Sequence, residues 1–297
     1  MATRGKERGK TGPYGQSGSI FINRAKRAVI KPWQLGACIV TGTDKVRSGF
    51  GNGDCLMLDF KNLVLAVSDA TERFPSASFS LLTRLADRLA RSGAPESEAD
   101  WRDLAKAVYA PQAYHHKATF SCVAISREGS RRTARVVHGG DSMVLLINLG
   151  TRRAEYATLA DMCFAGRAKQ LLCVDEIPLG NDGHGFIIAS DGITDTARLA
   201  GCALERMSGS VLSRVPLHEI PGALAEYLDG LPGPAEYDDI GLIVFSPIEL
   251  EATEHPTLLV GGTTPVEEVS YLRKVSEGTI EDAWITLDDA KDDIVRM

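Results

Sequence analysis

The pattern of apolar and polar positions predicts a chain rich in short strands. Apolar runs with β character stand at 36–42, 54–60 and 62–70, and the polar junction at Lys61 and Asn62 indicates a hairpin between the last two. Further strands are expected at 118–127, 133–141, 142–150, 186–192 and 239–247. Most of the core should therefore be built from β-structure.

Helical spacing of apolar residues appears between the strands, at 79–89, 100–110 and 218–231. Because the helices stand in groups without a steady βαβ alternation, the order predicts an α+β fold with largely antiparallel sheets over 36–248. Basic residues interleaved with glycine predict a solvated basic N-terminal arm over 1–35. An acidic C-terminal extension, 249–297, follows, with a candidate strand at 258–260 and a candidate helix near 266–275.

Composition narrows the classes of function. The apolar content of 44% and charged content of 24% are typical of globular proteins, and the net charge of −6 argues against a general nucleic-acid binder. No apolar run reaches the roughly twenty residues of a membrane span. The six cysteines form no C-x-x-C pair and stand largely in apolar runs, which favours a reduced, cytoplasmic environment. We expect no nucleic-acid or membrane partner, and the oligomeric state stays open.

Aspartates mark the ends of several predicted strands. Asp69, Asp141 and Asp191 each follow an apolar run, and Asp238 and Asp239 precede the last one. Carboxylates that converge in a low dielectric repel one another, so such a cluster normally needs cations. Oxygen ligands with few nearby His or Cys residues favour Mg²⁺ or Mn²⁺ over zinc.

The order of these motifs resembles a known family. "NGD" (52–54), "SDA" (68–70), "AT" (118–119), "GGDS" (139–142), "ASDGITD" (189–195) and "DDIGLIVF" (238–245) are similar to the successive motifs of the metal-dependent type 2C protein phosphatases. The resemblance covers 36–248. It implies two antiparallel sheets packed face to face with helices outside, an α-β-β-α sandwich, with a binuclear metal centre at one end.

The resemblance also implies roles for individual residues. Asp69 would bridge two Mg²⁺ or Mn²⁺ ions, the Ala70 carbonyl would bind one of them, and Asp191 and Asp238 would complete the other. Asp141 and Asp195, with Asp191, match positions that hold a third, weaker ion in some relatives. Asp54 matches an acidic position beside the centre, which acts through metal-bound water.

The implied activity is hydrolysis of phosphate monoesters, with phosphoserine and phosphothreonine proteins as substrates. Two metals can activate a shared water for in-line attack, so no covalent nucleophile is needed. An arginine fork suits a phosphate group, and Arg47 is the candidate, with Arg73 as the second choice.

Several departures from the family pattern motivate an alternative. Gly53 stands where many relatives carry a metal-binding Glu, Ala70 replaces the usual Gly, and "TERFPS" (71–76) replaces a glycine-rich turn with its histidine. The alternative is a catalytically weak, phosphatase-like binding or sensing module. A dinucleotide site at "GFGNGD" (49–54) is excluded because a strand rather than a helix follows it.

Overall fold

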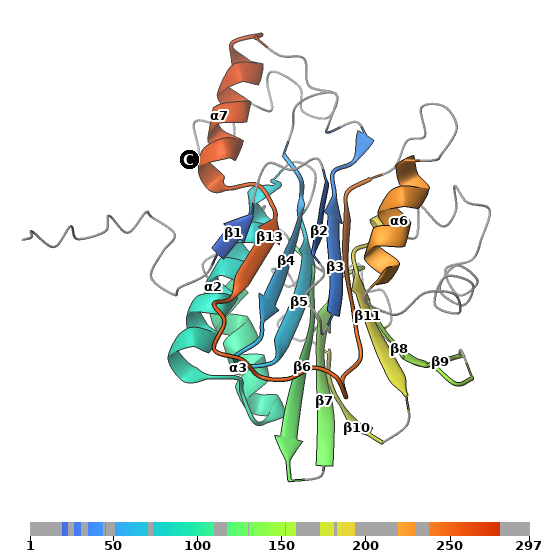
Figure 1. Ribbon diagram of the computed structural model, residues 1–297. Helices are drawn as coiled ribbons and strands as arrows, with labels where there is room; N and C mark the ends of the chain where they lie inside the picture. The colour runs from blue at the N-terminus through green and yellow to red at the C-terminus, as the bar shows by residue number, and fades with distance from the viewer. Residues whose placement is uncertain are drawn as a thin grey trace, which may run out of the picture.

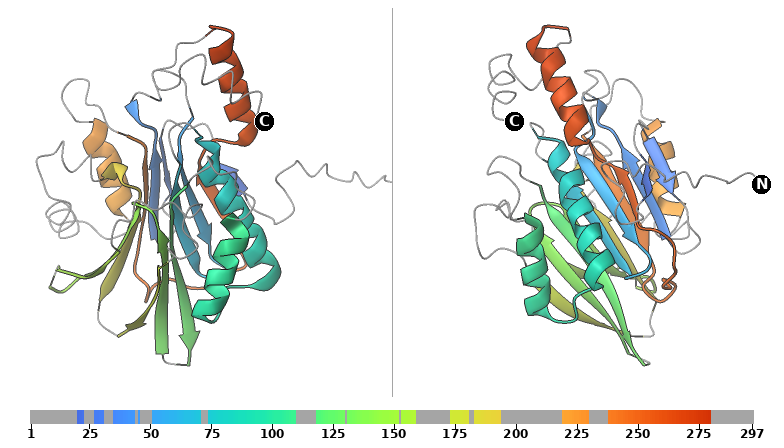
Figure 2. Two further views of the ribbon diagram at one scale, coloured as in Figure 1. Left: turned by 180° about the vertical axis from the view of Figure 1, so that it is seen from behind. Right: turned by 90° about the vertical axis from the view of Figure 1, so that its left-hand side faces the viewer.

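The structure is a computed structural model in which two β-sheets pack face to face and helices cover their outer faces (Figures 1 and 2). The residues that it describes are 20–22, 27–30, 35–43, 45, 51–70, 74–109, 118–129, 131–151, 153–158, 173–180, 183–193, 219–229 and 238–279.

The first sheet has seven strands, and its neighbours are antiparallel except for the parallel pair of β1 with β13. In spatial order the strands are β1 (Ile20–Ile22), β13 (Leu258–Gly261), β4 (Asp54–Asp59), β5 (Val64–Asp69), β6 (Phe120–Glu128), β7 (Arg131–Gly139) and β10 (Cys173–Leu179).

The second sheet has six strands, all antiparallel to their neighbours. Their spatial order is β2 (Arg27–Ile30), β3 (Leu35–Val40), β12 (Ile240–Phe245), β11 (His184–Ala189), β8 (Met143–Asn148) and β9 (Arg153–Ala157).

Helices bury the outer face of each sheet. The first sheet is contacted by α2 (Ser76–Ser92) and α3 (Glu98–Tyr109), and the second by α6 (Ile220–Asp229). After β13, α7 (Pro265–Ser276) packs against α2. A capping box between Thr264 and Glu267 begins α7 and supplies hydrogen-bond partners to its first turn.

The core strands are apolar on both faces because each sheet is covered twice. In β4, Leu56 and Leu58 point between the sheets, while Met57 faces the helices. Phe186 and Phe245 stack between the sheets with ring centroids 5.3 Å apart. Burial on both faces explains why these strands read as continuous apolar runs rather than as a strict alternation.

The predicted α+β sandwich is confirmed, and so is the hairpin of β4 and β5. β1 and β2 lie within the stretch predicted as a basic arm, and β13 and α7 follow the predicted boundary at residue 248. Sequence reasoning missed β9 and β10, whose side chains are largely exposed and lack an apolar run. Within the described ranges, no helix has both the length and the apolarity to cross a membrane.

Candidate metal centre

Two of the predicted aspartates meet on neighbouring strands. Asp54 begins β4, Asp69 ends β5, and the antiparallel register places them directly opposite each other. Opposite residues of an antiparallel pair share a face, and like charges there are destabilising. Burial and then Asp54 raise the pKa of Asp69. The pair therefore requires positive charge nearby.

Asp69 also belongs to a second cluster, which we call the three-aspartate group: Asp69, Asp141 and Asp191. Each offers a carboxylate oxygen that lies within 4.8 Å of the other two, and all three residues are partly exposed. Asp141 Oδ1 is buried and has no hydrogen-bond partner among the described residues. Three partly exposed aspartates this close, one of which has a buried oxygen without a partner among the described residues, could hold a divalent cation.

The backbone around Thr119 positions the three-aspartate group. The Asp69 N–H donates to Thr119 Oγ1 over 2.9 Å, and the Thr119 N–H donates to the Asp69 carbonyl over 2.7 Å. Gly140 has a φ of 106°, and a Cβ on it would lie 2.7 Å from Thr119 Cγ2. Glycine is therefore required at 140 for the chain to pass Thr119 and bring Asp141 beside Asp69.

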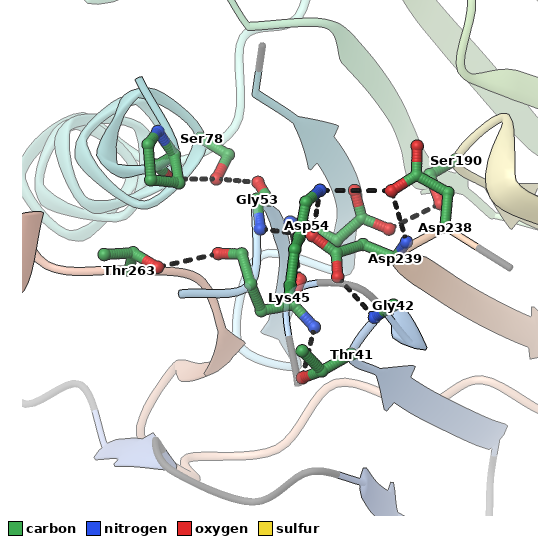
Figure 3. Close-up of polar contacts among 12 residues, drawn as sticks. Thr41, Gly42, Lys45, Gly53, Asp54, Ser78, Ser190, Asp238, Asp239 and Thr263 are labelled. Carbon is green, nitrogen blue, oxygen red and sulfur yellow. Dashed lines mark hydrogen bonds and ion pairs between the residues drawn. The ribbon is translucent and has the colours of Figure 1, made fainter. Parts of the chain in front are cut away.

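A different arrangement, which we call the lysine group, consists of Lys45, Asp238 and Asp239 (Figure 3). Lys45 Nζ lies 2.7 Å from Asp239 Oδ2 and 3.1 Å from Asp238 Oδ1. Asp239 also accepts backbone N–H groups from Gly42, over 2.7 Å, and from Gly53, over 2.6 Å. This group supplies its own positive charge.

Asp54 interacts with both groups, because Asp239 and Lys45 of the lysine group and Asp69 of the three-aspartate group all affect its pKa. Its Oδ2 accepts the Ser190 hydroxyl over 2.6 Å, and Ser190 Oγ in turn accepts the Gly241 N–H over 2.9 Å. Asp54 Oδ1 is buried without a hydrogen-bond partner among the described residues. A buried carboxylate oxygen in this state fits a nearby cation or a proton.

The pKa shifts of Asp54, Asp69 and Lys45 show how the charges of the site affect one another. Burial and then Asp239 raise the pKa of Asp54, whereas burial, Asp54 and Asp191 raise the pKa of Asp69. Burial would lower the pKa of Lys45, but Asp239 and Asp238 outweigh it, so this pKa is raised and the ammonium stays charged. The protein's own groups thus favour ionisation at Lys45 and oppose it at Asp54 and Asp69.

The structure brings together most of the residues predicted for the site. Asp54, Asp69, Asp141, Asp191 and Asp238 lie in it, and the buried Ala70 directly follows Asp69. Arg47, Asp195 and the second-choice Arg73 lie outside the described residues.

Sequence reasoning missed three contributors: Lys45, Ser190 and the anchoring role of Asp239. Ser190 precedes Asp191 in the strand-end motif, so its position was a usable signal. No sequence signal marked Lys45, because a single lysine after an apolar run ordinarily has a solvated side chain.

Comparisons with known proteins support the fold. No protein-family model matches the chain, and no curated protein matches its sequence. A solved bacterial serine phosphatase is similar with a TM-score of 0.53 at 16% identity, over 78% of this chain and all (100%) of that chain.

Two further structures agree with this match. The serine/threonine phosphatase of S. agalactiae has a TM-score of 0.51 at 15% identity, over 74% of this chain and 99% of that one. The SiaA-PP2C domain of Pseudomonas aeruginosa has a TM-score of 0.53 at 14% identity, over 74% of this chain and 85% of that one. At these identities the comparisons show the shared fold.

Proposed function

We propose that this protein is a metal-dependent hydrolase of phosphate monoesters, with phosphoserine and phosphothreonine in proteins as its substrate class. The observation that carries the proposal is the three-aspartate group, whose carboxylate oxygens lie within 4.8 Å of one another. The similarity in fold to serine/threonine phosphatases supports the same reaction and substrate class. Fold alone does not fix an activity, so the site chemistry is the main argument.

The residues present fit Mg²⁺ or Mn²⁺. Asp69, Asp141 and Asp191 offer hard oxygen ligands, and the buried, unpartnered Oδ1 atoms of Asp54 and Asp141 would be stabilised by a cation. The Ala70 carbonyl and Asp195 remain further predicted ligands. A divalent ion held by these residues would lower the pKa of a bound water and would neutralise phosphoryl oxygens.

Asp54 is the residue that we expect to accept and donate a proton. It lies directly opposite Asp69 on the neighbouring strand, and burial together with Asp239 raises its pKa, which makes it a better proton acceptor than an ordinary aspartate. The Ser190 hydroxyl fixes Oδ2, so the Asp54 side chain is held in one orientation. Arg47 remains the predicted residue that grips the phosphate.

The test is phosphate release from p-nitrophenyl phosphate and from phosphoserine peptides, with Mn²⁺, with Mg²⁺ and in EDTA. Asp191→Asn should lower kcat/KM by roughly 10²–10⁴-fold, because metal charge stabilisation is worth several kcal/mol. Asp103→Asn is the matched control, since this exposed aspartate on α3 pairs only with Lys106 in the described structure. Unchanged turnover in EDTA, or in Asp191→Asn, would refute the proposal.

The peptide arm of this experiment also separates the two hypotheses from the sequence. A binding or sensing module would retain phosphopeptides without releasing phosphate, whereas an enzyme turns them over. The partly exposed three-aspartate group favours the enzyme, because clustered carboxylates open to solvent serve no evident purpose in a scaffold. A preference for p-nitrophenyl phosphate over every peptide would assign a small phosphoester instead.

A further inference from the structure

Lys45 lies inside the acidic site rather than at its rim. Its side chain is 6% exposed, and its ammonium is shared between Asp239, at 2.7 Å, and Asp238, at 3.1 Å. Figure 3 shows the Lys45 side chain extending toward these carboxylates. A buried ammonium between two carboxylates provides the Coulombic attraction that a small metal cation would otherwise provide.

Gly53 leaves the room that this ammonium needs. A Cβ on Gly53 would lie 3.2 Å from the Ala70 carbonyl oxygen, 3.4 Å from Asp239 Oδ2 and 3.8 Å from Lys45 Nζ. Any longer side chain at 53 would crowd the space around the ammonium. Gly53 also donates its N–H to Asp239, so the same residue fixes the carboxylate and admits the lysine.

The lysine group and the carboxylates around Asp69 therefore differ in whether their oxygens have positive or hydrogen-bonding partners. Asp239 already has the ammonium and two backbone N–H donors, from Gly42 and Gly53. Asp141 Oδ1 and Asp54 Oδ1, by contrast, are buried without a partner among the described residues. An added cation would therefore stabilise the three-aspartate group and the neighbouring Asp54 more than the lysine group.

We propose that the Lys45 ammonium takes the place of one divalent ion, so that each chain binds about one Mg²⁺ or Mn²⁺, at the three-aspartate group, rather than the pair of a binuclear site. This inference rests on the proposed function. Asp238 then acts as a partner of Lys45 instead of a metal ligand. A second divalent ion beside the ammonium would be repelled by it and would have to compete for the same carboxylate oxygens.

Counting bound Mn²⁺ by equilibrium dialysis, together with its electron paramagnetic resonance spectrum, tests the proposal. The wild type should bind about one Mn²⁺ without spin coupling, because coupling requires a second ion about 3.5–4 Å away. Lys45→Ala removes the ammonium and opens its space, and should bind about two coupled ions. Lys45→Met fills the space without charge and should bind about one, as should Lys106→Ala, an exposed control.

The outcomes separate this inference from the proposed function. A wild type that binds two coupled ions overturns the role of Lys45 but leaves the hydrolase intact, and so does a folded Lys45→Ala variant that still binds one. A wild type that binds no Mn²⁺, or equal binding by Asp191→Asn, overturns both. Circular dichroism checks folding, and the wild-type count decides the question even if Lys45→Ala does not fold.

Discussion

The three-aspartate group and the lysine group share one acidic site but balance their negative charge differently. In the lysine group, the Asp239 side chain is 2% exposed, pairs with the Lys45 ammonium and accepts two backbone N–H groups. In the three-aspartate group, the residues are partly exposed, and the buried Asp141 Oδ1 lacks a partner among the described residues. Aspartates at strand ends can thus serve either to bind an ion or to fix the backbone.

Solvent access distinguishes the buried Lys45–Asp239 pair from the three-aspartate group. A partly exposed carboxylate can exchange water for a cation, whereas a buried ion pair must first be broken at a large desolvation cost. The lysine group joins the loop after β3, the approach to β4 and the start of β12 through Gly42, Gly53 and Asp239. We expect it to act as a fixed support beside an exchangeable metal site.

The largest effect on stability should follow from removing the charge of the lysine group. Lys45→Met keeps a side chain of similar length but leaves the buried Asp239 without its ammonium. Breaking a buried pair by removing one partner costs about 3–5 kcal/mol. Urea denaturation of the wild type and the variant, both in EDTA, measures the difference in free energy of unfolding.

Lys106→Met is the matched control for this measurement. Lys106 pairs with Asp103 on the surface of α3, with both side chains well exposed, so its loss should cost no more than about 0.5 kcal/mol. If Lys45→Met cost no more than this control, the two groups would not differ in the way the structure indicates.

A smaller effect is expected from loading the three-aspartate group. An ion that binds only the folded chain stabilises it by about 2.7 kcal/mol at a concentration one hundred times its Kd. Mn²⁺ should therefore raise the Tm of the wild type, while the same concentration should protect Asp141→Asn much less because a ligand is lost. Thermal unfolding with and without Mn²⁺ measures this.

Lys45→Met sharpens the same comparison. Its starting Tm should be low, but Mn²⁺ should still raise it, because the three-aspartate group is intact in this variant. Equal protection of the wild type and Asp141→Asn would show that the ion binds elsewhere.

Most of the sandwich could be predicted from the sequence, because its central strands are continuous apolar runs. β4, β5, β11 and β12 are buried on both faces, so their pattern is unmistakable from residue types alone. β9 and β10 are edge strands with mostly exposed side chains, and pairing with a neighbour rather than burial holds them in place. Local pattern carries little information about such strands.

The candidate site divides in the same way. Aspartates at strand ends were predictable, since each directly follows or precedes a recognisable strand. The pairing of Lys45 with Asp239 joins residues 194 positions apart, and the antiparallel pairing of β3 with β12 in the second sheet brings them together. Residue types along the chain do not reveal that one lysine, among many, is buried.

The pH dependence of the metal-free protein provides the most diagnostic test of the acidic site. Burial raises the folded-state pKa of Asp54 and Asp69, and the nearby carboxylates raise it further. Above the ordinary aspartate pKa of about 3.9, the unfolded chain has released protons that the folded chain still holds. In EDTA, stability should therefore fall as pH rises from about 4 toward the raised values.

The expected slope is at most about 1.4 kcal/mol per pH unit for each of the two aspartates. Urea denaturation across this range in EDTA measures it, and Asp54→Asn should reduce it because one of the two shifted groups is gone and the other loses a neighbouring charge. Saturating Mn²⁺ should reverse the trend, since ion binding requires the carboxylates to be ionised and so becomes stronger as pH rises. A stability in EDTA that increased over the same range would mean that protein cations already neutralise the three-aspartate group, and its contrast with the lysine group would be lost.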